Sequence, residues 1–140
     1  GPVPFQEISW YPYWKFGSLS INSLSRCLRY HVKQPSKGDN ILNNIVIFNF
    51  TKDGRLVLSS KNQTTELITP VPGINGIHEE FAPKYNAEHI LACLDNIESA
   101  FITFKINPHN IASPLVIHAY NPMGQNYYQE IIVSRNIASN

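Results

Sequence analysis

The chain has 140 residues, close to the usual size of one domain and enough to bury a hydrophobic core. Hydrophobic residues make up 43% of it and charged residues only 15%, which excludes a disordered, highly charged chain. The net charge of +1 excludes a strong overall field, so any contact with DNA has to come from a local group of cations.

The apolar stretches and the cysteines favour a cytoplasmic protein without a membrane partner. No apolar run reaches the roughly 20 residues that span a bilayer, and no stretch has the layout of a signal peptide. Cys27 and Cys93 lie beside leucines in two expected helices, so we expect free, buried thiols. Gly1-Pro2 is typical of the remnant of a cleaved tag.

The N-terminal residues are rich in aromatic side chains and in prolines, which oppose a regular helix. We expect residues 1–15 to form an extended arm that packs on a single domain of residues 16–140. The alternative is an aromatic segment offered to a partner.

The first half of the domain contains one predicted helix. Leu24, Cys27 and Leu28 recur at spacings of three and four, which defines an apolar face on a helix that begins at Asn22-Ser23. Asp53-Gly54 predicts a tight hairpin turn. The predicted order is strand 16–21, helix 22–32, strand 45–50, strand 55–60 and strand 64–69.

The same order recurs after a linker at 70–76. It consists of strand 78–82, a helix that follows Tyr85-Asn86, and strands 101–106, 115–119 and 127–133. Two such copies predict an α+β fold in which two helices, related by an approximate internal two-fold, lie on one face of a continuous antiparallel sheet. That arrangement lets both apolar helix faces share one core.

The sequence contains none of the common enzyme motifs. It has no glycine-rich phosphate loop, no arrangement typical of a serine or cysteine nucleophile, and no metal-binding spacing of cysteine, histidine or acidic residues. We expect scattered surface or structural roles for the histidines and no enzymatic activity, cofactor or metal. The histidines are His31, His78, His89, His109 and His118.

Several segments together are similar to the repeat of one protein family. YNAEHILACL at 85–94 is similar to the family pattern F-N-x-x-Y-L-L-x-A-L, and SPLVI at 113–117 matches S-P-L-x-I. The strand and hairpin segments at 42–48 and 53–60, and the strand at 131–135, follow in the family's order. Over about residues 16–135 the chain thus resembles one domain of a bacterial sliding clamp, the beta subunit of DNA polymerase III, and most closely the last of its three domains.

The resemblance implies a DNA-clamp-like fold and a non-enzymatic processivity factor or scaffold for replication and repair. Clamps of this family are rings of six such domains whose helices face double-stranded DNA. Their partners, DNA polymerase and other clamp-binding proteins, dock peptides in a pocket near the last domain. The resemblance therefore implies weak, sequence-independent binding of duplex DNA, peptide partners and a homo-oligomer.

The first predicted helix carries the candidate DNA contacts. At 100° per residue, Arg26, Arg29 and Lys33 fall together, opposite the apolar face. Cations there would meet phosphates without reading bases. The alternative is an ordinary solvated helix face. The second helix shows Glu88 and Asp95 on its outer side, which would repel phosphates.

The candidate peptide site comes from the resemblance. Asn86 and His89 match the family's pocket-edge asparagine and tyrosine, and Val133 and Arg135 belong to the matching terminal strand. That strand departs from the family's M-P-x-R-L ending, because the proline and the final leucine are missing. An alternative role for Asn86 is a helix N-cap.

Two other functions are consistent with the sequence. One is a clamp-fold protein-interaction domain without DNA binding, of phage, plasmid or divergent origin. The other is an unrelated β-rich binding module, with Trp10 and Trp14 on an exposed platform. The strands at 64–69 and 127–133 are expected sheet edges, so we also expect self-association through them or coverage of one edge by the arm.

Overall fold

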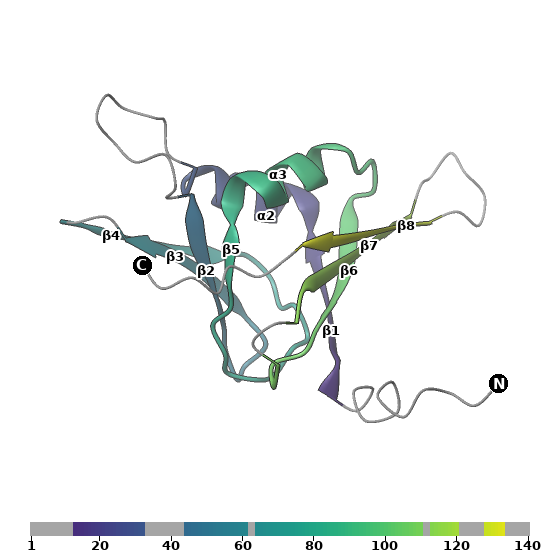
Figure 1. Cartoon of the computed structure of the whole chain (residues 1–140), viewed down its shortest axis with the longest axis horizontal. Helices are drawn as coiled ribbons and strands as arrows, with labels where there is room; N and C mark the ends of the chain where they lie inside the picture. The colour runs from purple at the N-terminus through teal and green to yellow at the C-terminus, as the bar shows by residue number, and fades with distance from the viewer. Residues whose placement is uncertain (1–12, 33–43, 62–63, 111–112, 121–127, 134–140) are drawn as a thin grey trace.

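The computed structural model describes residues 13–32, 44–61, 64–110, 113–120 and 128–133. Within these residues, two helices and eight strands follow one another in a pattern that occurs twice (Figure 1). The first copy is β1 (Lys15–Ser20), α2 (Ile21–Arg29), β2 (Ile45–Phe50), β3 (Leu56–Lys61) and β4 (Glu66–Val71). The second is β5 (Lys84–Asn86), α3 (Ala87–Asp95), β6 (Phe101–Ile106), β7 (Leu115–Tyr120) and β8 (Tyr128–Val133).

The two copies exchange their first strands. The strands form two four-stranded antiparallel sheets, in the orders β1-β6-β7-β8 and β4-β3-β2-β5. Each sheet therefore takes three strands from one copy and the first strand from the other. This exchange confirms the predicted α+β fold with two strand–helix–three-strand repeats, and it ties the two halves into one domain.

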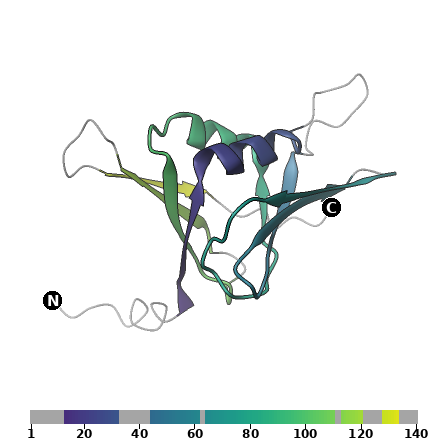
Figure 2. The same ribbon diagram turned by 180° about the vertical axis from the view of Figure 1, so that it is seen from behind.

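The sheets diverge as the two sides of a wedge. They run up from shared loops, and α2 and α3 lie side by side across the open end (Figures 1 and 2). Both helices cover the same side, as predicted, but the continuous sheet predicted from the sequence is wrong, because the described strands pair as two separate sheets. The inner faces of the sheets instead pack on each other, with Phe50 of β2 and Phe104 of β6 at a ring-centroid distance of 6.2 Å.

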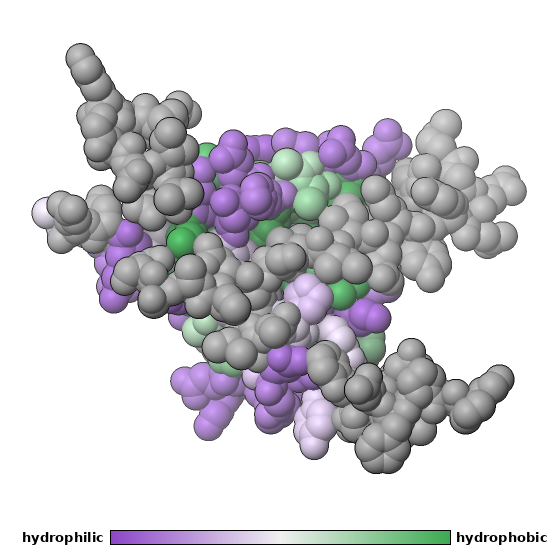
Figure 3. All heavy atoms as spheres, viewed as in Figure 1, coloured by the Kyte–Doolittle hydropathy of each residue, from purple (hydrophilic) through white to green (hydrophobic). Residues whose placement is uncertain are grey.

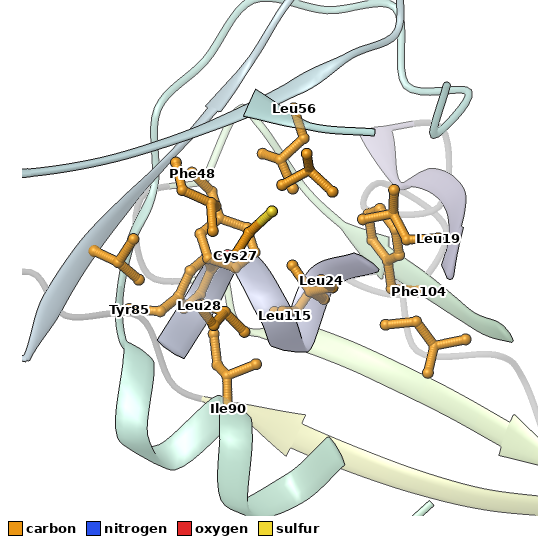
Figure 4. Close-up of a cluster of buried hydrophobic side chains, with 14 of the residues drawn as sticks. Leu19, Leu24, Cys27, Leu28, Phe48, Leu56, Tyr85, Ile90, Phe104 and Leu115 are labelled. Atoms are coloured by element: carbon orange, nitrogen blue, oxygen red, sulfur yellow. The ribbon is translucent and has the colours of Figure 1, made fainter. Parts of the chain in front are cut away.

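One hydrophobic core fills the wedge (Figure 4). Alternate residues of β2 and β6 point inward, as Val46, Phe48 and Phe50 do on β2. The ring of Phe48 meets the ring of Tyr85 edge-on at 5.0 Å. Because both sheets and both helices contribute to this core, neither half of the chain can bury its apolar face alone.

The structure corrects the second predicted repeat at its start. The segment at 78–82 is not a strand, since Phe81 makes only an isolated bridge with Phe50. The strand is β5 instead, so Tyr85 is extended and buried before the helix begins. β4 also runs on to Val71 and includes Pro70, which an edge strand tolerates because its missing N–H is not needed for the ladder.

No helix in the described ranges is long and apolar enough to cross a membrane. The helix layer is hydrophilic on its outer side, as shown by the residues gathered along the top of Figure 3.

Candidate nucleic-acid and partner interfaces

Helix α2 forms because its ends and its faces are both well specified. Ser20 is extended, and its Oγ accepts a hydrogen bond from the N–H of Ser23 at 3.3 Å, which caps the N-terminus. Leu24 and Leu28 are buried in the core. The two arginines of the last turn suit the negative end of the helix dipole.

The outer side of α2 holds two of the three predicted DNA-binding cations. Arg26 and Arg29 are exposed and three residues apart, so they lie on adjacent turns of one face. Neither forms a salt bridge with another described residue. Lys33, the third predicted cation, lies outside the described residues. The two guanidinium groups thus remain available for an anion.

Helix α3 presents the opposite charge on the same side of the domain. Glu88 and Asp95 are exposed, and the Oε2 of Glu88 accepts a hydrogen bond from the Nδ2 of Asn44 at 2.9 Å. Because α2 and α3 lie side by side, cations and carboxylates share the helix layer. Among the described residues of this layer, those of α2 are electrostatically suited to phosphate and those of α3 are not.

The predicted peptide site is partly described. Asn86 is half-buried and its Oδ1 accepts a hydrogen bond from the N–H of His89 at 3.1 Å, so its side chain caps α3. His89 is exposed one turn into the helix. Val133 ends β8, which contacts α3, whereas Arg135 lies outside the described residues.

His31 is a buried polar residue for which the sequence predicted a surface or structural role but no partner. The sequence indicates only that it lies on the apolar side of the helix, and the structure places it in the fully buried core region beyond α2. Its Nδ1 lies 2.7 Å from the Oγ of Ser60 and its Nε2 lies 2.9 Å from the Oγ1 of Thr69. It thereby joins α2 to β3 and to the edge strand β4. Serines and threonines on the inner side of the strands are the only sequence signal of such a partner.

Cys27 and Cys93 are both free cysteines. Cys27 is buried and its Sγ lies 3.6 Å from the carbonyl oxygen of Pro70, while Cys93 is half-buried. Burial raises the pKa of both thiols, and the nearby Arg26 partly offsets this for Cys27. Since the thiolate is the nucleophile, a raised pKa is opposite to what a catalytic cysteine needs.

The described residues contain no group of three histidine, cysteine or acidic side chains that could hold a metal ion.

Comparison with known proteins gives matches among solved structures only. No family model matches the chain, and no curated protein matches it by sequence. The beta sliding clamp of Caulobacter crescentus matches with a TM-score of 0.68 at 15% identity, over 99% of this chain and 34% of that chain. The DNA polymerase III beta subunit of Thermotoga maritima matches with a TM-score of 0.65 at 21% identity, over 99% of this chain and 35% of that one.

This chain has the fold of a single sliding-clamp domain. The sliding clamp of Bacillus subtilis agrees, with a TM-score of 0.64 at 16% identity over 97% of this chain. The chain spans about a third of the length of these solved clamps, which fits the predicted resemblance to one clamp domain. Its correspondence to the last of the three clamp domains stays a prediction, as do the arm at 1–15 and the domain boundaries.

Proposed function

We propose that this clamp domain is a non-enzymatic processivity or scaffold domain whose α2 faces duplex DNA. The observation that carries the proposal is the pair of exposed arginines on the outer side of α2, in a fold shared with sliding clamps. Guanidinium groups on a solvent face hold phosphates without selecting a sequence. With few phosphate contacts, the affinity for duplex DNA is weak and falls with added salt.

A ring requires several such domains, so encircling DNA depends on assembly with further domains. The sheet edges are the surfaces that support assembly, because unpaired backbone groups there can extend a sheet into a neighbouring domain. Partner peptides of a polymerase or another clamp-binding protein would dock near the start of α3 and the end of β8. His89 is exposed there, and the capping bond of Asn86 uses its Oδ1, so its Nδ2 group keeps both N–H donors.

The DNA contact is tested by fluorescence anisotropy of a labelled duplex at two salt concentrations. Replacing Arg26, Arg29 and Lys33 with alanine should abolish binding, because the variant removes the cations that release counterions. The matched control is K52A/R55A/K61A, which removes equal charge from exposed positions outside α2. It should keep most of the affinity.

An equal loss of affinity in both triple variants would show that net charge alone attracts the duplex, and the α2 assignment would then be wrong. Binding that survives the α2 triple variant would contradict it equally.

A protein-interaction domain without DNA binding is the second candidate. The specific observation in its favour is the acidic side of α3, where Glu88 and Asp95 are exposed beside the cations of α2. No measurable binding of duplex at low salt, together with capture of a clamp-binding peptide, would favour this function.

A further inference from the structure

The outer face of the sheet β1-β6-β7-β8 exposes two phenylalanines on its first two strands. In the register of β1 and β6, Phe16 pairs with Lys105 and Ser20 pairs with Phe101, so these side chains leave the sheet on the same side. Phe16 is 62% exposed and Phe101 is 61% exposed, whereas Phe104 points inward and is buried. Both rings therefore face solvent on the side away from the core.

The two exposed phenylalanines point to a binding role, because large apolar side chains grouped on a surface commonly mark a binding site. The core does not use these rings, since both are absent from the buried cluster that fills the wedge. They are also separate from α2 and α3, which pack against the inner faces of the sheets.

Within β1 and β6, the positions between and beside the rings are polar and carry no carboxylate. Ser18 pairs with Thr103 between the two phenylalanines, and both are exposed. Lys105 lies beside Phe16, and its Nζ is 5.3 Å from the centroid of the Trp14 ring. Neither β1 nor β6 contains a carboxylate. The face thus combines aromatic rings, hydroxyl groups and one cation held over a third aromatic ring.

We propose that this face binds single-stranded DNA. Aromatic rings stack on unpaired bases, a lysine attracts the phosphates, and hydroxyl groups donate to base edges or to the backbone. The rings are four residues apart along the sheet, about 13 Å, and stacked bases lie about 3.4 Å apart. Each ring therefore stacks on a separate base, which favours a single strand because a duplex keeps its base faces inside.

A polyanion suits this face better than a second copy of the chain. Two apolar rings alone would suit either occupant, but a cation without a neighbouring carboxylate on β1 and β6 is complementary to phosphate. The site lies on another side of the domain from α2, so it goes beyond the proposed duplex contact and can fail independently of it.

The test uses the full chain and a labelled oligothymidine of about 12 nucleotides, within the ~4–16 nucleotides that one single-strand-binding fold covers. Anisotropy at low salt should show binding, and F16A/F101A should weaken it roughly tenfold or more, because stacking on each ring contributes. The matched control is Y30A/I74A, which removes side chains that are 65% and 62% exposed elsewhere. It should bind as the wild type does. The α2 triple variant should lose duplex binding and keep oligothymidine binding.

Further variants separate base stacking from a general hydrophobic contribution and from misfolding. F16L/F101L keeps apolar area without a stacking surface, so its affinity should fall as in the alanine variant while its thermal melting stays close to the wild type. The proposal is overturned if the wild type does not bind oligothymidine. It is also overturned if either phenylalanine variant binds oligothymidine as tightly as the wild type does. If F16A/F101A loses self-association but binds oligothymidine as the wild type does, the face binds a second copy of the chain instead. If the wild type binds oligouridine more tightly than oligothymidine, the assignment to DNA is overturned.

Discussion

Asn75 joins three segments where the two sheets meet. Its N–H donates to the carbonyl of Gly54 at 2.7 Å, its own carbonyl accepts from the N–H of Ser18 at 2.8 Å, and its Oδ1 accepts from the N–H of Ile77 at 2.8 Å. Gly54 has a φ of +83°, which suits glycine and lets the β2–β3 hairpin close against Asn75. One side chain and its backbone thus fasten the hairpin of one sheet to β1 of the other.

Gly17 leaves the space that this junction needs. A Cβ built on Gly17 would lie 2.6 Å from the Cζ of Phe104 and 3.0 Å from the carbonyl oxygen of Asn75. Gly17→Ala should therefore lower the free energy of unfolding by about 1–3 kcal/mol, the usual cost of overpacking, as measured by urea denaturation. Ser18→Ala is the control, because Ser18 is exposed and its backbone bond survives the change. Equal stability of both variants would contradict this account of the junction.

At the scale of elements, the two helices begin in the same way. Each is preceded by an extended residue whose side chain accepts from the N–H three positions later, Ser20 for α2 and Asn86 for α3. Seven residues after each cap comes a cysteine, Cys27 and Cys93, in the equivalent place of the repeat. The internal two-fold therefore extends to the caps, while the charges on the outer sides of the helices differ.

The cap at α3 provides a test of what Asn86 does. Asn86→Ala should cost about 0.5–2 kcal/mol of stability, because an N–H of the first turn loses its partner, and Asn86→Ser should restore most of it. Thermal or urea denaturation measures both. If Asn86 also touches a partner peptide, Asn86→Ser should remain stable and yet bind the peptide more weakly. Wild-type stability of Asn86→Ala would contradict the capping role.

At the scale of the whole molecule, β4 and β8 are edge strands, as predicted from the sequence, and β5 and β1 are the opposite edges of the same two sheets. β4 is poorly protected, because Leu67 and Ile68 are exposed on its two faces and Glu66 is its only charge. The arm that we expect to cover an edge lies mostly outside the described residues, so its position stays a prediction.

Edge pairing predicts self-association that depends on β4. Light scattering should show a mass that rises with concentration, and Ile68→Lys should keep the chain monomeric, because a charge on an exposed edge opposes strand pairing. Ile74→Lys is the matched control, since Ile74 is equally accessible but lies outside the strands. Deleting residues 1–12, which leaves β1 intact, should increase association if the arm covers an edge. A strict monomer at both lengths would contradict edge pairing.

Hydrophobic periodicity and turn residues predicted well those elements that depend on residues near one another in the sequence. The strands at 45–50 and 101–106 have their predicted bounds, and α2 begins within a residue of its predicted start. The prediction failed for the first strand of the second copy, which was expected at 78–82 and lies at Lys84–Asn86. The strand forms there because Tyr85 fills a place beside Phe48 in the core, and that contact is not visible in local sequence.

The sequence by itself determined the repeat, the apolar side of each helix and the cationic outer side of α2, because these depend on residue spacing along one element. The tertiary structure decided which strands pair, that the sheet divides in two, and that Phe16 and Phe101 share one exposed face. Those features depend on contacts between residues far apart in the chain. β1 pairs with β6 and not with a strand of its own repeat, since only that exchange lets both halves bury their apolar faces in one core.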